Sequence, residues 1–434
     1  MLKSGQRSRD SLGVHGYRHA MGAALIFSGL PLAWYSRVWF GKEDDRVFSI
    51  VLVAIALLLV THWGRLIRGR FSVSPFVALL PFLFIWPAML MAWFFGRSDD
   101  ISALYLAFVS AFFLALLTSP RHAFLMMPIA FFDIALIVAL LSLGQFVFFG
   151  PVLLLSEDAD FGSRLFAGDS KNPNYLAFVA GLGLVAAFSK RKDWSGSGIV
   201  RWWLWVTGIP LLVVVWLLSG TRSVLLGFGL CLSSVVLQHV IAPRRIRAAA
   251  SLLDGNLPKT KRVWGLLSIW VPMAALISAL IGNALVASTE GLVSGTVAGF
   301  DVYVAGGLRE VDESAEARTM LRERAFSEFN MWGQGYDALY VDAPVLQAFF
   351  DLGLLGGLAF VLVTLVLPFG WWILKVRSSG ISVEQRFPFL VYLFFLPNLI
   401  LHGRPYDFSV WLPVMLLFCV IARRDIDLKP ALLR

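Results

Sequence analysis

The sequence has 434 residues, of which 58% are hydrophobic and only 15% are charged, and its mean hydropathy is +0.75. This composition excludes an ordinary soluble domain and indicates an all-α polytopic membrane protein. The net charge of +9 would suit a nucleic-acid partner, but Lys and Arg lie in short segments between apolar runs, where they orient helices and contact anionic membrane lipid. We therefore expect no nucleic-acid partner.

About twelve apolar runs are long enough to cross roughly 30 Å of hydrocarbon as helices. In chain order they cover residues 19–39, 47–62, 74–95, 101–118, 123–149, 174–189, 202–218, 223–242, 263–287, 353–374, 387–401 and 406–422. The first run follows a basic segment, but no small-residue cleavage site comes after it, so we expect a retained helix. Both cysteines, Cys231 and Cys419, fall inside predicted helices, which leaves neither a disulfide framework nor a cysteine metal site.

The basic residues predict how these helices are oriented. If both termini are cytoplasmic, the clusters of Lys and Arg fall in cytoplasmic segments, as the positive-inside rule requires. Two long segments, 150–173 and 288–343, and the short turn 402–405 then lie on the outer face, and long connections of this kind usually have a function. The chain divides accordingly into five N-terminal helices, a central region with the outer segments, and two C-terminal helices with a cytoplasmic tail: residues 1–149, 150–375 and 376–434.

Polar residues gather at the end of the first outer segment, in GSRLFAGDSKNPNYLAF, and in the next outer turn, LLSGTRSVLLGF. Asn174 is placed to cap the following helix, so the first stretch can be a loop and a capped helix. Alternatively, Arg164, Lys171 and Asn174 present hydrogen-bond donors to an anion or a sugar. In the second turn, the guanidinium of Arg222 either reaches lipid phosphate or binds a diphosphate through two hydrogen bonds.

The long outer segment predicts an amphipathic surface helix over residues 314–329. Its apolar side at helical spacing is formed by Met320, Leu321, Ala325 and Phe326. Arg318 and Arg322 are four residues apart and therefore share a face, where either an anion or neighbouring glutamates offset their charges. The turn WGQGY follows, and its Trp332 and Tyr336 suit stacking on sugar rings or an ordinary loop at the membrane interface.

The shortest outer turn, HGRPYDF, holds His402, Arg404 and Asp407 between two apolar runs. The histidine is either a hydrogen-bonded structural residue or a base. Asp133 differs, because it lies about ten residues inside the fifth predicted helix. We expect it to be functional or, with no other charged residue predicted inside a helix, to be a protonated acid that bonds a neighbouring helix.

The stretch YVDAPVLQAFFDLGLLGG, residues 340–357, opens the tenth predicted helix and carries two acids. From Pro344 the apolar run is roughly ten residues longer than a span needs, so its first turns are expected at the outer interface. There Gln347 and Asp351 are four residues apart and form a polar face on which Asp351 stays in water. Asp342 either favours the positive end of the helix dipole or takes part in chemistry.

Taken in order, these motifs resemble the O-antigen ligase and polymerase (Wzy-type) family of bacterial integral-membrane glycosyltransferases. The resemblance covers roughly residues 160–375. It rests on four motifs. They are the Asn-Pro-Asn turn before a helix (residues 172–174), the SGTRS turn with Arg222, the helix that carries Arg318 with the WGQGY turn after it, and the pattern L-Q-x-x-x-D-L-G-L-L-G (residues 346–356).

The resemblance implies transfer of a glycan from undecaprenyl diphosphate to an acceptor hydroxyl at the outer face of the inner membrane, with inversion and without a metal or cofactor. Its implied partners are the lipid-linked glycan, an acceptor glycan or lipid, and a chain-length regulator. Preorganised arginines would neutralise the diphosphate leaving group, and the candidates are Arg164, Arg222, Arg318 and Arg322. The residues expected to hold glycan or acceptor are Lys171, Asn174, Trp332, Tyr336 and Arg404.

One position departs from the family pattern. Ligases of the family carry a histidine just before the helix of the last motif, where this sequence has Asp342. We therefore favour a polymerase of O-antigen, capsule or exopolysaccharide repeat units over a ligase acting on lipid A core, with Asp342 or His402 as the base. A transporter or flippase of lipid-linked oligosaccharide is the alternative from another class, since many helices and an intramembrane acid also suit a carrier.

Overall fold

The structure is a computed structural model, and it describes residues 15–28, 32, 35, 38, 46–68, 74–95, 102–149, 153–154, 164–165, 173–189, 199–219, 221, 223–241, 313–336, 339–378, 381–401 and 403–423. Outside these residues lie the predicted span 263–287 and the predicted site residues Lys171, Arg222 and His402. Only the backbone is described for Arg164 and Arg318.

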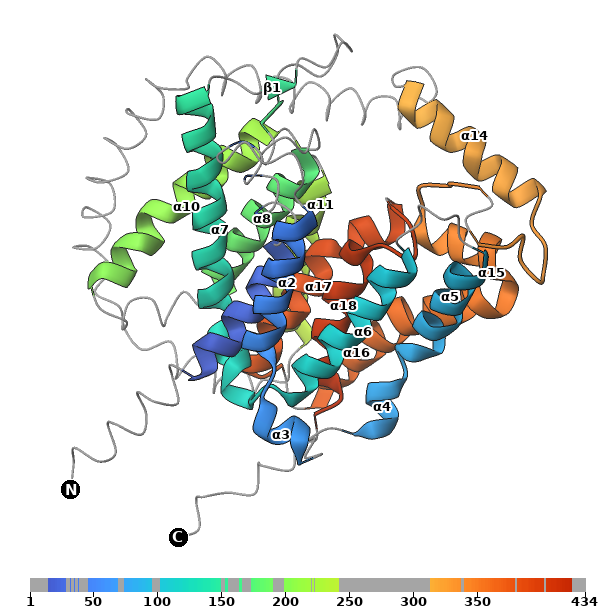
Figure 1. Ribbon diagram of the computed structural model, residues 1–434, viewed down its shortest axis with the longest axis horizontal. Helices are drawn as coiled ribbons and strands as arrows, with labels where there is room; N and C mark the ends of the chain where they lie inside the picture. Colours follow the sequence, from blue (N-terminus) through green and yellow to red (C-terminus); the bar gives the residue numbers. More distant parts are fainter. Residues whose placement is uncertain are drawn as a thin grey trace. The chain divides into compact units, whose positions relative to one another are not determined.

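The chain forms two compact units, each made of two separate segments. Figure 1 labels elements of both. Unit 1 combines Met1–Val60 with Arg121–Gly306, and unit 2 combines Thr61–Pro120 with Gly307–Arg434. The described elements of unit 1 are the helical residues 15–28, α2 (Arg46–Val60), α7 (Arg121–Phe149), β1 (Leu153–Leu154), β2 (Arg164–Leu165), α8 (Pro173–Ser189), α10 (Ile199–Ser219) and α11 (Ser223–Ile241). Those of unit 2 are α3 (Trp63–Ile67), α4 (Pro75–Leu79), α5 (Phe82–Phe95), α6 (Ser102–Thr118), α14 (Glu313–Ser327), α15 (Pro344–Val361), the π-helix η2 (Leu362–Val366), α16 (Leu367–Ser378), α17 (Val383–Leu401) and α18 (Phe408–Ile421).

The helical fold class is confirmed. The apolar runs predicted between residues 47 and 242, and between 353 and 422, are helical, and most ends differ by a few residues at most. The described part also contains one short antiparallel pair, in which Leu153 lies opposite Leu165. Four described helices are long and apolar enough to cross a membrane: Phe76–Phe95, Arg121–Gln145, Val200–Ser219 and Pro344–Val376. Twelve spans and an outer location of residues 288–343 stay predictions.

The predicted run 74–95 is two helices, α4 and α5, joined by a turn at Leu80 and Pro81. Proline has no backbone N–H and cannot donate within a helix. The amide of Leu80 bonds back to Val77, and α5 then starts anew with the carbonyl of Pro81 accepting from Ile85. Pro81 therefore interrupts the hydrogen bonding inside the candidate span Phe76–Phe95, which the apolar pattern predicts as one regular helix.

Helices α7, α8 and α10 pack together in unit 1, with α8 against both others. Small residues allow the close approach: a Cβ added at Gly183 of α8 would lie 2.5 Å from the Cβ of Ala135 in α7. At Gly208 of α10, an added Cβ would lie 2.6 Å from the side chain of Leu136. Small residues commonly bring membrane helices this close, because backbones then gain van der Waals contact.

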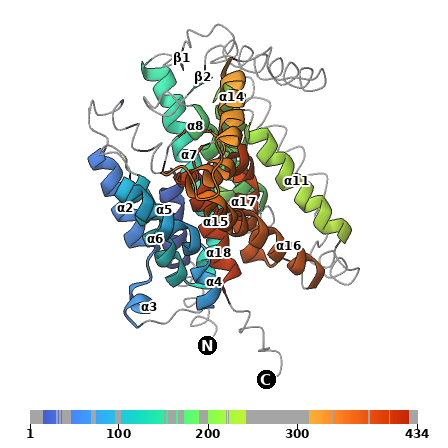
Figure 2. The same cartoon turned by 90° about the vertical axis from the view of Figure 1, so that its right-hand side faces the viewer.

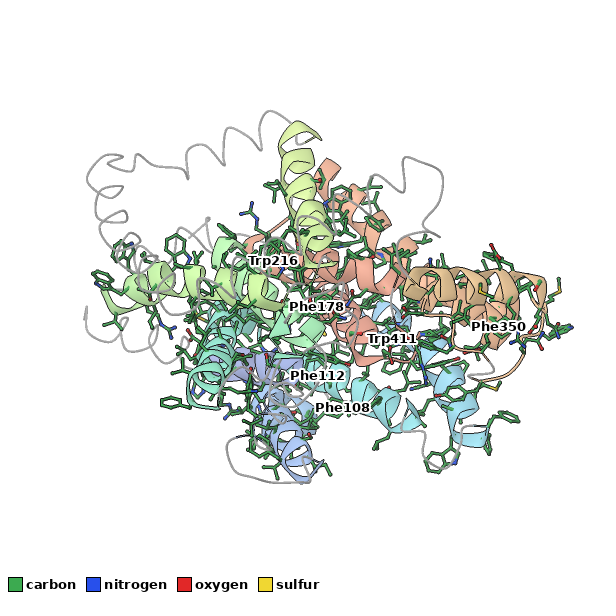
Figure 3. The ribbon with its side chains drawn as sticks, turned by 90° about the horizontal axis from the view of Figure 1, so that it is seen from above. Phe108, Phe112, Phe178, Trp216, Phe350 and Trp411 are labelled. Atoms are coloured by element: carbon green, nitrogen blue, oxygen red, sulfur yellow. The ribbon has the colours of Figure 1, made fainter. Side chains whose placement is uncertain are left out.

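The core of unit 2 is aromatic and lies between α5, α15 and α18. The rings of Phe84 and Phe360 have centroids 4.9 Å apart, and both contact Trp411, whose position Figure 3 labels. The indole nitrogen of Trp411 donates to the carbonyl of Pro405 at 2.6 Å. This bond fixes the turn before α18 against the core, and that turn carries the predicted site residue Arg404.

Candidate functional site

Helix α15 is broken at Gly353, where the backbone has φ +69°. In an unbroken helix the carbonyls of Phe350 and Asp351 would accept from the amides four residues later. Here they accept instead from Gln334 at 2.8 Å and from Gly335 at 3.1 Å, two residues of the turn after α14. The amide of Leu354 in turn donates to Met331 at 2.9 Å. The WGQGY turn thus supplies the hydrogen bonds that the break removes (Figure 2 shows α14 above α15).

A polar cluster lies beneath this turn. Asp351 accepts from the Tyr406 hydroxyl at 2.9 Å and from the Gln347 side-chain amide at 3.3 Å, and it is only 1% exposed. The prediction that Asp351 stays in water is therefore wrong. Gln347 and Asp351 do share a face at i and i+4, but Tyr406 and the docked turn cover that face.

Tyr336, predicted to stack on a sugar, belongs to the same cluster. Its ring lies 4.7 Å from that of Tyr406 and is 7% exposed, so it contributes to the packing of the turn. Trp332, at the other end of WGQGY, is 82% exposed. The two aromatic residues of the turn therefore have opposite environments.

Asp342 connects two segments of the sequence, each predicted to lie on the outer face, that are 61 positions apart. Its Oδ1 accepts from the amide of Gly403 at 2.7 Å and from the hydroxyl of Tyr340 at 2.8 Å. Asp342 has φ +51°, a left-handed conformation that aspartate adopts more readily than most residues. The N-cap position of α15 is taken by Ala343, so the described contacts of Asp342 join the loop to the 402–405 turn.

Burial and the adjacent Asp342 carboxylate raise the pKa of Tyr340 above its ordinary value, so its phenol stays protonated and donates. The guanidinium of Arg404 lies 5.0 Å from the centroid of the same ring, within cation–π range. The amide of Arg404 donates to Asp407 Oδ2 at 2.7 Å. An acid, a guanidinium and a phenol thus meet at one edge of unit 2.

Arg322 of α14 reaches this edge as well. Its Nη2 donates to the carbonyl of Leu401 at 3.4 Å, beside the same turn. Its buried Nε has no hydrogen-bond partner among the described residues. Arg324, two positions later, is instead paired with Glu328 at 2.8 Å and is exposed. Of the arginines whose side chains are described on α14, Arg322 is the one that borders the candidate site.

The predicted apolar side of the surface helix is only partly correct. Ala325 is buried in a small core with Val341 and Phe350. Met320 and Phe326, expected on that side, are exposed. Of the four residues predicted on that side, Ala325 is thus the buried one, Leu321 is partly buried, and Met320 and Phe326 face outward.

The structure also joins the Asn-Pro-Asn and SGTRS motifs, within unit 1. Thr221 of the SGTRS turn donates its hydroxyl to Asn174 Oδ1 at 3.2 Å. The indole of Trp216 donates to the carbonyl of Thr221 at 3.3 Å, and Trp216 is labelled in Figure 3. The expectation that Asn174 caps the helix is wrong, because α8 begins at Pro173 and Asn174 lies in its first turn.

Asp133 has partners that sequence reasoning missed. Arg201 Nη1 contacts both of its carboxylate oxygens, at 2.5 and 2.7 Å, and the Tyr17 hydroxyl donates to it at 2.5 Å. Arg201 is the third residue of α10, whereas the apolar pattern started that helix at residue 202. The prediction that Asp133 is the only charged residue in a helix is therefore wrong. The sequence signal for this partner was Arg201 itself, which stands directly before the apolar run that starts at residue 202.

No group of three or more His, Cys, Asp or Glu side chains that could hold a metal ion occurs among the described residues. No protein-family model matches the chain, and the searches of curated proteins and of solved structures found no match.

Proposed function

We propose that the chain is a membrane glycosyltransferase that acts on undecaprenyl-diphosphate-linked oligosaccharide at the outer face of the inner membrane. We favour polymerisation of repeat units of an O-antigen, capsule or exopolysaccharide. The observation that carries the proposal is the bond between Asp342 and Gly403, which brings an acid and the guanidiniums of Arg322 and Arg404 to one edge of unit 2.

The reaction needs two things from the protein, a proton acceptor and a stabiliser of the leaving group. The acceptor hydroxyl oxygen attacks the anomeric carbon, and the bond from that carbon to the diphosphate oxygen breaks with inversion. The diphosphate leaves with the electron pair, and the hydroxyl proton passes to Asp342 or His402. Arg404 lies in the turn between α17 and α18, Arg322 reaches the start of that turn from α14, and both suit the charge that develops on the diphosphate.

The cationic part of the site is tested by comparing two arginines that border it with one arginine of α14 that does not. Arg322→Ala and Arg404→Ala should each lower transfer about a hundredfold, because one lost contact to a developing anion costs about 3 kcal/mol. Arg324→Ala should leave the rate unchanged, since that arginine is exposed and already paired with Glu328. Purified protein would be incubated with lipid-linked repeat units and the products sized. Equal rates for all three variants would exclude the guanidinium assignment.

The same assay tests the remaining predicted residues. Arg222→Ala and Arg318→Ala should also abolish transfer if these arginines bind the donor. Asp342→Asn keeps an oxygen that accepts from Gly403 and Tyr340, so its loss of activity would point to the base and not to folding. His402→Ala is the parallel test of the other candidate. Addition of lipid A core distinguishes the ligase alternative, which predicts glycan on the core and no longer chains.

One observation favours the transporter alternative. Asp133 lies in the middle of the candidate span Arg121–Gln145 and is paired with Arg201 at the start of another. Charged residues inside membrane helices often line transport pathways. A flippase would move fluorescent lipid-linked oligosaccharide across a vesicle membrane without changing its length, and Asp133→Asn would stop that movement. Longer products in the polymerisation assay would decide against it.

A further inference from the structure

The exposed apolar surface of the helix at Pro344–Val376 begins abruptly after Gly353. Between Pro344 and Gly353 every residue is described and none is exposed. From Leu354 onward, exposed large apolar side chains recur along the helix: Leu354, Leu355, Leu358, Leu362, Val366, Ile373 and Leu374. This pattern is expected for a helix that is surrounded by protein before Gly353 and exposed to lipid after it.

The length of this exposed band matches a bilayer. The 33 residues of Pro344–Val376 would extend about 50 Å as a helix, far more than the roughly 30 Å of hydrocarbon. From Leu354 to Leu374 the rise is about 30 Å. Lys375 follows directly, as expected for a residue at the boundary with water. Gly353 therefore lies at the level of the opposite hydrocarbon boundary.

Backbone hydrogen bonds fix the WGQGY turn at that same level. Met331 accepts from Leu354, and Gln334 donates to Phe350. The turn and the end of α14 carry four exposed apolar side chains, which we call the interfacial patch: Phe326, Phe329, Met331 and Trp332. The patch is thus adjacent to the first lipid-exposed residues of α15.

Phe326, in the last turn of α14, follows Arg322 at i+4 and shares its side of the helix. Glu323, Arg324 and Ser327 lie on other sides, and Phe329 lies just beyond the end of the helix. Tryptophan concentrates at the level of lipid headgroups, because its ring is apolar and its N–H needs a polar partner. An exposed Trp beside arginine and phenylalanine is the composition of such a surface.

We propose that the interfacial patch is embedded in the phospholipid headgroup layer, and that Gly353 marks the edge of the hydrocarbon. Trp332 then contacts lipid, and glycan stacking on its ring is excluded. The proposal concerns the membrane position of unit 2 and does not rest on the glycosyltransferase assignment.

The experiment measures the depth of single labels in the full-length chain. Cys231 and Cys419 are replaced by Ala, and Trp332→Cys carries an environment-sensitive fluorophore in vesicles of phosphatidylcholine and phosphatidylglycerol. Ser327→Cys is the matched control on the charged side of α14, and Leu355→Cys is the deep reference. Quenching is measured with spin-labelled lipids of different depth and with aqueous iodide. Met331→Cys provides a second patch position, since Met331 holds α15 only through its backbone oxygen.

The patch labels should be quenched several times more strongly by headgroup-level lipid quenchers than the Ser327 label, and Leu355 should report a deeper position. Quenching by iodide alone at positions 331 and 332 would overturn the proposal and return Trp332 to solvent, where a glycan can stack. Protection from both quenchers would overturn it too, because the patch would then be covered by protein.

Discussion

Two glycines determine whether the WGQGY turn can dock on α15. A Cβ at Gly353 would overlap the carbonyl oxygen of Met331, and one at Gly333 would overlap that of Asp351. Both glycines also have positive φ, which costs other residues about 1–2 kcal/mol. The close approach of the two backbones therefore permits no side chain at either position.

Gly353→Ala should consequently lower the thermal unfolding temperature of the detergent-solubilised protein. The matched control is Gly370→Ala in α16, where an added Cβ meets nothing within 4 Å. Alanine there should leave stability unchanged or raise it by up to about 1 kcal/mol, since it favours the helix. Equal unfolding temperatures for the two variants would show that the break at Gly353 is not a stabilising feature.

At the scale of elements, one ion pair joins helices of unit 1. Asp133 of α7 binds Arg201 of α10 and Tyr17 of the first helical stretch, and the Arg201 guanidinium lies 5.8 Å from the Tyr17 ring. Removing one partner of such a pair leaves the other charge poorly solvated. Because the Arg201 side chain is 32% exposed, the loss should be smaller than for a fully buried pair.

Asp133→Asn and Arg201→Gln should therefore each destabilise the protein, and the double variant should lose less than the sum of the two. The expected coupling is about 0.5–3 kcal/mol, obtained from unfolding temperatures of the four proteins in one detergent. Strictly additive effects on stability would mean that the two side chains do not interact favourably in the folded state.

The elements themselves could be predicted well, and their side-to-side contacts could not. Long apolar runs specify helices because backbone groups in lipid must bond internally. Run length says nothing about lateral neighbours. Tyr406, which buries Asp351, is 55 positions away, and Arg201 is 68 positions from Asp133. Three of the motifs that the sequence singled out, WGQGY, the start of α15 and the turn before α18, contact one another in unit 2. The burial of Asp351 beneath them was not predicted.

For the whole molecule, the prediction that remains to be measured is topology. Twelve spans is an even number, so both termini should lie on the cytoplasmic side. Fusions of a fluorescent protein that matures only in the cytoplasm should be bright at either end. Fusions of a phosphatase that is active only outside should be active in residues 150–173 and 288–343. A bright fusion at one terminus only would require an odd number of spans.

The docked turn also constrains how the protein is made. Residues 331–335 leave the ribosome before the helix that they complete, so the turn can dock only after Gly353 has been synthesised. Until then, the carbonyls of Phe350 and Asp351 can bond only to water or within an unbroken helix. We therefore expect the nascent segment to enter the translocon as one continuous 33-residue helix. The break then forms late, when the turn displaces water from the two carbonyls.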